Sequence, residues 1–173
     1  ALLDKAIAKG QSSAADKDAL LAKIKATADL EDLRGCDLIV EAVFEDIKLK
    51  HKIQRETESL LAVGGFWGSN TSGLPITQLA EASVNPKNFI GIHFFSPVDK
   101  MPLIEIICGE HTSDETLARA FDYAQQIKKT PIVVNDSLAF FTSRTFGTDL
   151  DEGTRLLAEG LHPIRIDNLG KAI

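Results

Sequence analysis

The strongest constraint on the fold is an alternation between short apolar runs and segments with helical spacing. The apolar runs, rich in β-branched and aromatic residues, lie at residues 37–43, 64–70, 88–95, 102–109 and 131–136. Segments with helical periodicity separate most of them, at residues 46–62, 74–82 and 113–128. Strands that alternate with helices are typical of βαβ units, so the sequence predicts an α/β fold with a doubly wound, Rossmann-like sheet.

The two ends of the chain are predicted to be helical. Residues 1–28 show helical spacing that is interrupted by a turn at residues 10–13. After Asp136 the strand pattern stops, and residues 143–160 and 162–173 again show helical spacing. We therefore expect the sheet domain to end at residue 136 and residues 137–173 to begin an α-helical C-terminal domain.

Composition excludes several classes of protein. The chain has 173 residues, of which 44% are hydrophobic and 25% charged, so it should fold around a core. Its net charge of −6 and its lack of a basic stripe argue against nucleic-acid binding. No apolar run approaches the roughly twenty residues of a membrane span. Cys36 and Cys108 lack metal-binding spacing, so we expect both to be reduced and partly buried and no metal to be bound.

Polar residues cluster where three of the predicted strands end. The first strand runs into Val43, Phe44 and Glu45, the second ends in a polar stretch at residues 69–72, and the third carries His93. Open parallel sheets bind ligands beyond the carboxyl ends of their strands. We therefore expect a functional site along this edge of the sheet.

His93 and Glu105 each lie inside an apolar strand, where an unpaired polar side chain is costly. If they pair, Glu105 accepts from one ring nitrogen and leaves the other free to take a proton from a substrate. The alternatives are a hydrogen-bonded core histidine and a glutamate that faces water from an edge strand. Spacing alone does not decide whether the two meet.

Other candidates have equally ordinary interpretations. Ser72 precedes a predicted helix and could serve as its N-cap. Glu45 and Lys50 lie near the start of another helix, where the dipole favours an acidic residue and Lys50 could be solvated. The glycines at residues 64–68 lack the spacing of a dinucleotide-binding turn. The residues alone thus indicate an α/β domain with an acid–base site and say nothing about NAD.

Three segments resemble the L-3-hydroxyacyl-CoA dehydrogenase family: DLIVEAVFEDIKLK (residues 37–50), SNTSGLPI (69–76) and GIHFFSPVDKMPLIEII (91–107). The resemblance covers nearly the whole chain, and His93 and Glu105 fall on the family's catalytic histidine and glutamate. It implies oxidation of an L-3-hydroxyacyl-CoA to the 3-ketoacyl-CoA with NAD, in fatty acid β-oxidation. His93 would remove the hydroxyl proton, and Glu105 would support the resulting imidazolium.

The resemblance also assigns roles to further residues. The positions that match NAD contacts of the family are Val43, Phe44, Glu45, Lys50, Ser72 and Ser96. Ser72 is also a catalytic candidate, placed to touch the substrate hydroxyl or keto oxygen. Ser143 matches a substrate-binding position at which many members have asparagine, so it would reach the thioester carbonyl with a shorter side chain.

The resemblance sets expectations for the domains, partners and location. The family's glycine-rich turn and its flanking strands do not precede Ala1, so residues 1–136 would be a partial NAD-binding domain lacking its first βαβ portion. Residues 137–173 would start the substrate and dimerisation domain. Residues 140–144 (FFTSR) are similar to bacterial members fused to an enoyl-CoA hydratase.

We therefore expect an acyl-CoA substrate and either a homo-oligomer or a multifunctional β-oxidation complex. The location would be the cytoplasm in bacteria, or the mitochondrial or peroxisomal matrix in a eukaryote. Two other hypotheses remain: a non-catalytic remnant that binds a partner, and an NAD-dependent 3-hydroxy acid dehydrogenase that does not use CoA.

Overall fold

The computed structural model describes residues 2–172, and the chain divides into two compact units between Asp32 and Leu33. The first unit contains α1 (Leu2–Ala8) and α2 (Ala14–Leu21), so the predicted pair of helices is confirmed, but the second helix ends at Leu21 and not near residue 28. A capping box starts α2: the Ser13 hydroxyl accepts from the N–H of Asp16, whose carboxylate accepts from the N–H of Ser13. Neither helix has a buried residue.

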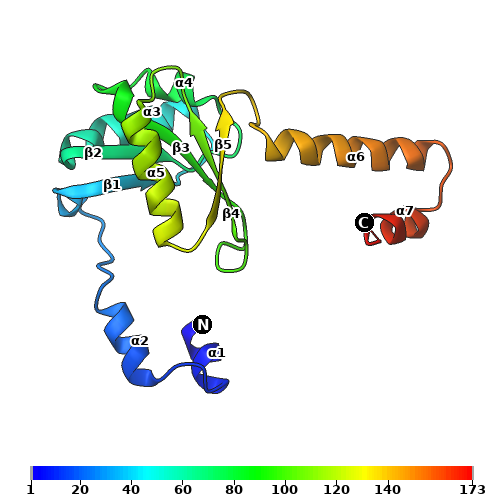
Figure 1. Ribbon diagram of the computed structural model, residues 1–173, viewed down its shortest axis with the longest axis horizontal. Helices are drawn as coiled ribbons and strands as arrows, with labels where there is room; N and C mark the ends of the chain where they lie inside the picture. Colours follow the sequence, from blue (N-terminus) through cyan, green and yellow to red (C-terminus); the bar gives the residue numbers. More distant parts are fainter. Residues whose placement is uncertain (1, 173) are drawn as a thin grey trace. The chain divides into compact units, whose positions relative to one another are not determined.

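The second unit is built on a five-stranded sheet (Figure 1). Its strands follow chain order: β1 (Cys36–Glu41), β2 (Leu61–Ser69), β3 (Phe89–Phe94), β4 (Leu103–Cys108) and β5 (Thr130–Asn135). All five predicted strands are confirmed.

The sheet is mixed and not wholly parallel. β1, β2 and β3 are parallel to one another, β4 is antiparallel to β3, and β5 is parallel to β4. The expectation of parallel strands therefore holds only within β1–β3 and within β4–β5. The cause is the connection at residues 95–102, because a parallel neighbour requires a crossover of about a dozen residues or more.

Helices cover both faces of the sheet and follow its last strand. They are α3 (Ile47–Thr57), α4 (Ile76–Ala80), α5 (Asp114–Gln126), α6 (Thr142–Ala158) and α7 (Pro163–Gly170), with 3₁₀ turns at Leu30–Leu33, Glu58–Leu60 and Pro86–Asn88. Ser113 caps α5, because its hydroxyl accepts from the N–H of Thr116. No helix within residues 2–172 is long and apolar enough to cross a membrane.

Strand alternation divides the core into two layers. Trp67, Phe89 and Ile107 pack with α4 on one face, whereas Ile90 and Ile106 pack with α5 on the other. Figure 1 shows α5 crossing the front of the sheet. Residues of odd number in β3 and β4 share the α4 face, and the side chains discussed next lie on that face.

Gly91 should be required for the packing of α4 on the sheet. A Cβ at Gly91 would lie 2.7 Å from Cδ1 of Ile76 and 2.9 Å from Cβ of Ile107. Overpacking of this kind costs about 1–3 kcal/mol, so Gly91→Ala should lower the free energy of unfolding by that amount in a urea titration.

Gly147→Ala is the matched control, because nothing lies within 4 Å of a Cβ at this position in α6. It should raise stability by about 0.5–1 kcal/mol, since alanine is the better helix former. Equal effects of the two substitutions would contradict the packing argument.

Candidate active site

His93 and Glu105 face each other across β3 and β4. They are register partners in the antiparallel pair, and Nδ1 of His93 lies 2.8 Å from Oε2 of Glu105. His93 is 5% exposed and Glu105 is fully buried, so the alternative of a glutamate that faces water is wrong. The contact considered from the sequence is thus present, because the short connection turns β4 back along β3.

The Glu105 carboxylate receives four hydrogen-bond donors. Oε2 accepts from the His93 ring and, at 2.7 Å, from the Thr142 hydroxyl. Oε1 accepts from the backbone N–H groups of Thr142 at 2.8 Å and Phe141 at 3.2 Å. An ionised carboxylate offers only acceptors, and four donors are the partners it requires. With Glu105 ionised, the proton of its contact with His93 lies on Nδ1, and a neutral ring then has its lone pair on Nε2.

Nε2 of His93 is reachable from outside. Within residues 2–172 no hydrogen bond uses this nitrogen, and no buried side-chain nitrogen or oxygen is left without a partner. Nε2 must therefore have access to solvent. The rings of Phe95 and Phe140 lie beside the imidazole, with centroid distances of 4.4 and 6.0 Å. The arrangement can accept a proton from a ligand held next to the ring.

Lys50 is buried, which corrects the interpretation of a solvated lysine. It is 2% exposed, and its ammonium lies 2.8 Å from Oε1 of Glu41 and 3.2 Å from Oε2 of Glu45. The buried residues of α3 are Lys50, Gln54 and Thr57, at helical spacing. Lys50 therefore lies on the stripe of α3 that faces the sheet, where only nearby carboxylates can compensate its charge.

Glu41 is a site residue that the sequence interpretation missed. This last residue of β1 accepts from Lys50 and from the N–H of Val43 at 2.6 Å through Oε1, and from the Ser69 hydroxyl at 2.8 Å through Oε2. It thereby joins β1, β2 and α3. Its signal was a charge inside the apolar run DLIVEAV, the same signal that identified Glu105.

Glu45 holds the turn that follows β2. Its Oε1 accepts from the Thr71 hydroxyl at 2.5 Å and from the N–H of Ser72 at 2.9 Å. Partial burial acts to raise the pKa of Glu45, but the Thr71 hydroxyl, the Lys50 ammonium and the Ser72 N–H outweigh it and lower the pKa. Glu45 is therefore ionised at neutral pH.

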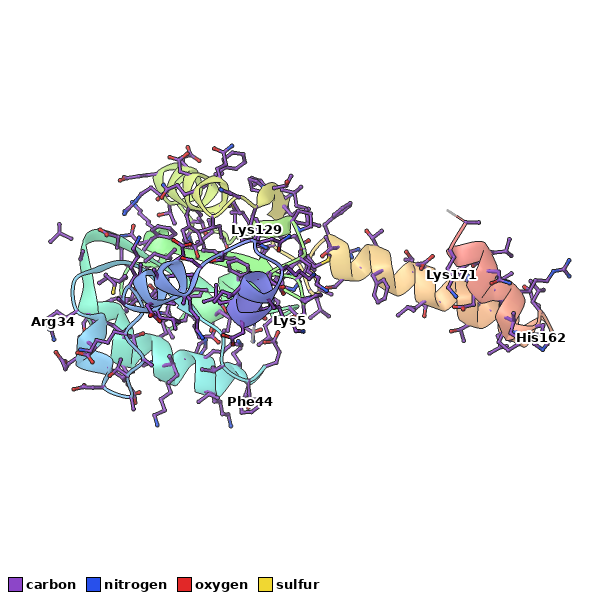
Figure 2. All side chains as sticks on the ribbon, turned by 90° about the horizontal axis from the view of Figure 1, so that it is seen from below. Lys5, Arg34, Phe44, Lys129, His162 and Lys171 are labelled. Carbon is purple, nitrogen blue, oxygen red and sulfur yellow. The ribbon has the colours of Figure 1, made fainter. Side chains whose placement is uncertain are left out.

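The remaining predicted residues are exposed or partly buried. Val43 is half-buried, and Phe44 is 86% exposed, with its ring at the surface in Figure 2. Ser72 is exposed, and its carbonyl accepts from the Ser143 hydroxyl at 3.4 Å. Ser96 is exposed in the connection after β3 and shares no hydrogen bond with the other predicted residues within the described chain.

Ser72 is not the N-cap of α4. That helix starts at Ile76 after Pro75, which provides no side-chain cap. The carboxylate of Asp136 instead accepts from the N–H groups of Ile76 and Thr77, both at 2.8 Å. Ser72 is therefore free of the capping role.

Asn70 connects the network around Glu41 with the strand that carries His93. Its N–H donates to the carbonyl of Glu41 at 2.8 Å, and its side-chain oxygen accepts from the N–H of Phe94 at 2.8 Å. The strand that carries His93 is thereby fixed to the end of β1. A groove of about 610 Å³ lies beside the Glu105 end, lined by Val133, Val134, Asn135, Ser137, Phe140, Phe141, Arg144, Thr145 and Thr148.

The two cysteines are free and partly buried, as predicted. Burial, with a smaller effect from Asp114, raises the pKa of the Cys108 thiol. Residues 2–172 contain no group of three His, Cys, Asp or Glu side chains that could hold a metal ion.

Residues 1–137 match the family described as 3-hydroxyacyl-CoA dehydrogenase, NAD binding domain. The chain is 42% identical, over 99% of its length, to the fatty acid oxidation complex subunit alpha of Shewanella amazonensis. It spans 24% of the length of that relative.

Two solved structures have the same fold. The (S)-3-hydroxybutyryl-CoA dehydrogenase of Ralstonia eutropha is 38% identical with a TM-score of 0.87, covering 92% of this chain and 56% of its own. The dehydrogenase part of multifunctional enzyme 1 from C. elegans is 31% identical with a TM-score of 0.73, covering 99% of this chain and 40% of its own.

Removing the Lys50 charge should strongly destabilise the protein. Lys50→Met leaves Glu41 buried without its cation, which costs about 3–5 kcal/mol for a buried pair. Lys52→Met is the control on the same helix, because Lys52 is 67% exposed and pairs with Glu56 at 3.8 Å. Its loss should cost about 0.5 kcal/mol or less in the same urea titration. A Lys50→Met effect no larger than that of Lys52→Met would refute the account of the network.

Glu45 should make stability depend on pH in the acid range. Because the folded protein lowers the pKa of Glu45 below its ordinary 4.5, the stabilisation is complete above that value and is lost as the pH falls through the folded-state pKa. The melting temperature of wild type should therefore exceed that of Glu45→Gln at neutral pH, and the two should converge below pH 4.5. A difference that is constant across this range would argue against an ionised Glu45.

Proposed function

The chain belongs to the 3-hydroxyacyl-CoA dehydrogenase family, and on that premise we propose that it carries the acid–base residues for oxidation of an L-3-hydroxyacyl-CoA to the 3-ketoacyl-CoA. The observation that carries the proposal is the geometry of His93. Its Nδ1 is bound to a buried carboxylate at 2.8 Å, and its Nε2 is open to a ligand. A general base requires this combination of a fixed ring and an accessible nitrogen.

In the proposed mechanism His93 is the base. The proton of the substrate 3-hydroxyl passes to Nε2, which gives the imidazolium two N–H groups. Glu105 stabilises that cation through the contact at Nδ1, and the contacts with Phe141 and Thr142 hold its carboxylate in place. In the reverse direction the imidazolium returns the proton to the keto oxygen.

The residues at the ends of β1 and β2 fit a dinucleotide. Phe44 offers an exposed ring, and the side chain of Glu45 is 44% exposed and ionised, able to accept from ribose hydroxyl groups. We assign NAD contacts to Val43, Phe44, Glu45, Lys50, Ser72 and Ser96, with Lys50 acting by holding Glu45. When bound, NAD supplies the hydride acceptor for C3 of the substrate.

Ser72 and Ser143 would bind the substrate. Their contact at 3.4 Å brings the turn after β2 and the start of α6 to the same place. The Ser72 hydroxyl is exposed and takes no part in capping, so it is available to the substrate hydroxyl or keto oxygen. Ser143 is proposed to reach the thioester carbonyl.

We further propose that residues 1–136 belong to the NAD-binding domain and residues 137–173 to a helical substrate and dimerisation domain. The end of the family match at residue 137 supports this division. The similarity to a fatty acid oxidation complex subunit supports a homo-oligomer or a multifunctional complex, and a bacterial protein of this kind would act in the cytoplasm.

His93→Gln in the complete protein should strongly lower turnover and leave NAD affinity unchanged. Glutamine can still donate to Glu105, so the fold is kept while the base is lost. We expect the kcat for 3-hydroxybutyryl-CoA to fall about 10²–10⁴-fold, with NAD affinity measured by titration calorimetry. His111→Gln, at an exposed position, is the control.

Substrate choice distinguishes the acyl-CoA proposal from a hydroxy acid dehydrogenase, and a lack of turnover with either substrate would favour the non-catalytic remnant. Turnover of 3-hydroxybutyryl-CoA should far exceed that of free 3-hydroxybutyrate under the same conditions. A preference for the free acid would replace the CoA proposal with a hydroxy acid dehydrogenase. Full activity of His93→Gln would contradict the proposal that His93 is the general base.

A further inference from the structure

We propose that Thr142 is a positioning residue for the His93–Glu105 pair, an inference that rests on the proposed function. Thr142 is the first residue of α6, and it makes two contacts with the carboxylate of Glu105. Its hydroxyl donates to Oε2 at 2.7 Å, and its N–H donates to Oε1 at 2.8 Å. One residue thus binds both oxygens of the carboxylate.

Two contacts from one residue fix the rotation of the carboxylate. The terminal torsion of a glutamate has a broad energy minimum, so packing around the side chain does not determine the plane of its oxygens. His93 donates to Oε2, the oxygen that also accepts from the Thr142 hydroxyl. The plane that Thr142 sets therefore determines the direction in which the His93 ring is held and the direction in which Nε2 points.

The backbone before Thr142 adopts an unfavourable conformation that places Thr142 beside Glu105. Ala139 and Phe140 have φ values of 62° and 48°, in the left-handed region that non-glycine residues seldom adopt. The N–H of Ala139 donates to the carbonyl of Gly73 at 3.0 Å, and the Phe140 ring is buried beside His93. The left-handed backbone at Ala139 and Phe140 changes the direction of the chain, so that the first N–H groups of α6 lie against Glu105.

Glu105 in turn caps α6. The N-cap residue Phe141 provides no side-chain acceptor, so the first N–H groups of the helix are satisfied by a carboxylate from β4. A negative charge at a helix N-terminus is favourable. The helix that carries Ser143 and the strand that carries Glu105 are therefore held by one contact, which sets the substrate-binding serine relative to the base.

The test is Thr142→Val in the complete protein. Valine has the shape of threonine and keeps the backbone N–H on Oε1, so it removes only the hydroxyl contact with Oε2. We expect kcat to fall about tenfold while the KM for NAD changes less than about twofold, because the base is misaligned and the cofactor contacts are untouched. Thr142→Ser should restore kcat to within about twofold of wild type.

A second readout does not depend on turnover. The downfield proton resonance of Nδ1–H in His93, assigned by its loss in His93→Gln, should shift and exchange faster with water in Thr142→Val, and it should return in Thr142→Ser. Thr154→Val is the matched control, because Thr154 is an exposed threonine of the same helix whose hydroxyl donates to the carbonyl of Leu150. It should change neither readout. If valine prevents folding, Thr142→Ala removes the same hydroxyl without a branched side chain.

Wild-type kcat together with an unchanged Nδ1–H resonance in Thr142→Val would overturn the inference. An equal loss in Thr142→Val and Thr142→Ser would also overturn it, because the hydroxyl would then not be the group that matters. Active His93→Gln protein combined with a shifted resonance in Thr142→Val would refute the proposed function and leave the positioning of the ring supported.

Discussion

The buried carboxylate of Glu105 is the constraint on which the rest of the site depends. An ionised carboxylate without partners is very costly in a protein interior. Glu105 avoids this cost with four donors from three residues, His93 on β3 and Phe141 and Thr142 at the start of α6. This one carboxylate therefore links β3, β4 and the start of α6, and the short connection after β3 is what places Glu105 opposite His93.

Glu41 plays the corresponding part at the neighbouring strand ends. Its buried oxygens accept from Lys50, the Val43 N–H and the Ser69 hydroxyl, and Lys50 in turn holds Glu45 against the turn at Thr71 and Ser72. Asn70 connects this network to β3. Two buried carboxylates therefore hold the proposed functional residues in place. Glu41 holds the proposed cofactor residues, and Glu105 holds the proposed base. Each carboxylate joins elements that are distant in the sequence.

Much of this could be predicted from the sequence. The strands and helices follow local periodicity, and His93 and Glu105 stood out as polar residues inside apolar runs. The antiparallel direction of β4 follows only from the short connection between β3 and β4, which local periodicity does not reveal. Lys50 lies three residues from both Ile47 and Ile53, which pack against the core, so its burial could have been predicted from helical spacing, although a lysine near a helix start is ordinarily solvated. The contact of Thr142 with Glu105 depends on left-handed backbone at Ala139 and Phe140, which no glycine signals.

The central claim is that the charge of Glu105 makes His93 a base, and the turnover of Glu105→Gln in the complete protein tests it most directly. The amide has the shape of the carboxylate, but its NH₂ must face either the two backbone N–H groups or the His93 ring and the Thr142 hydroxyl. We predict a loss in kcat of about a hundredfold or more with NAD affinity retained, as for removal of the charge that orients a catalytic histidine. Wild-type turnover in Glu105→Gln would contradict the account, because the buried carboxylate would then serve the fold alone.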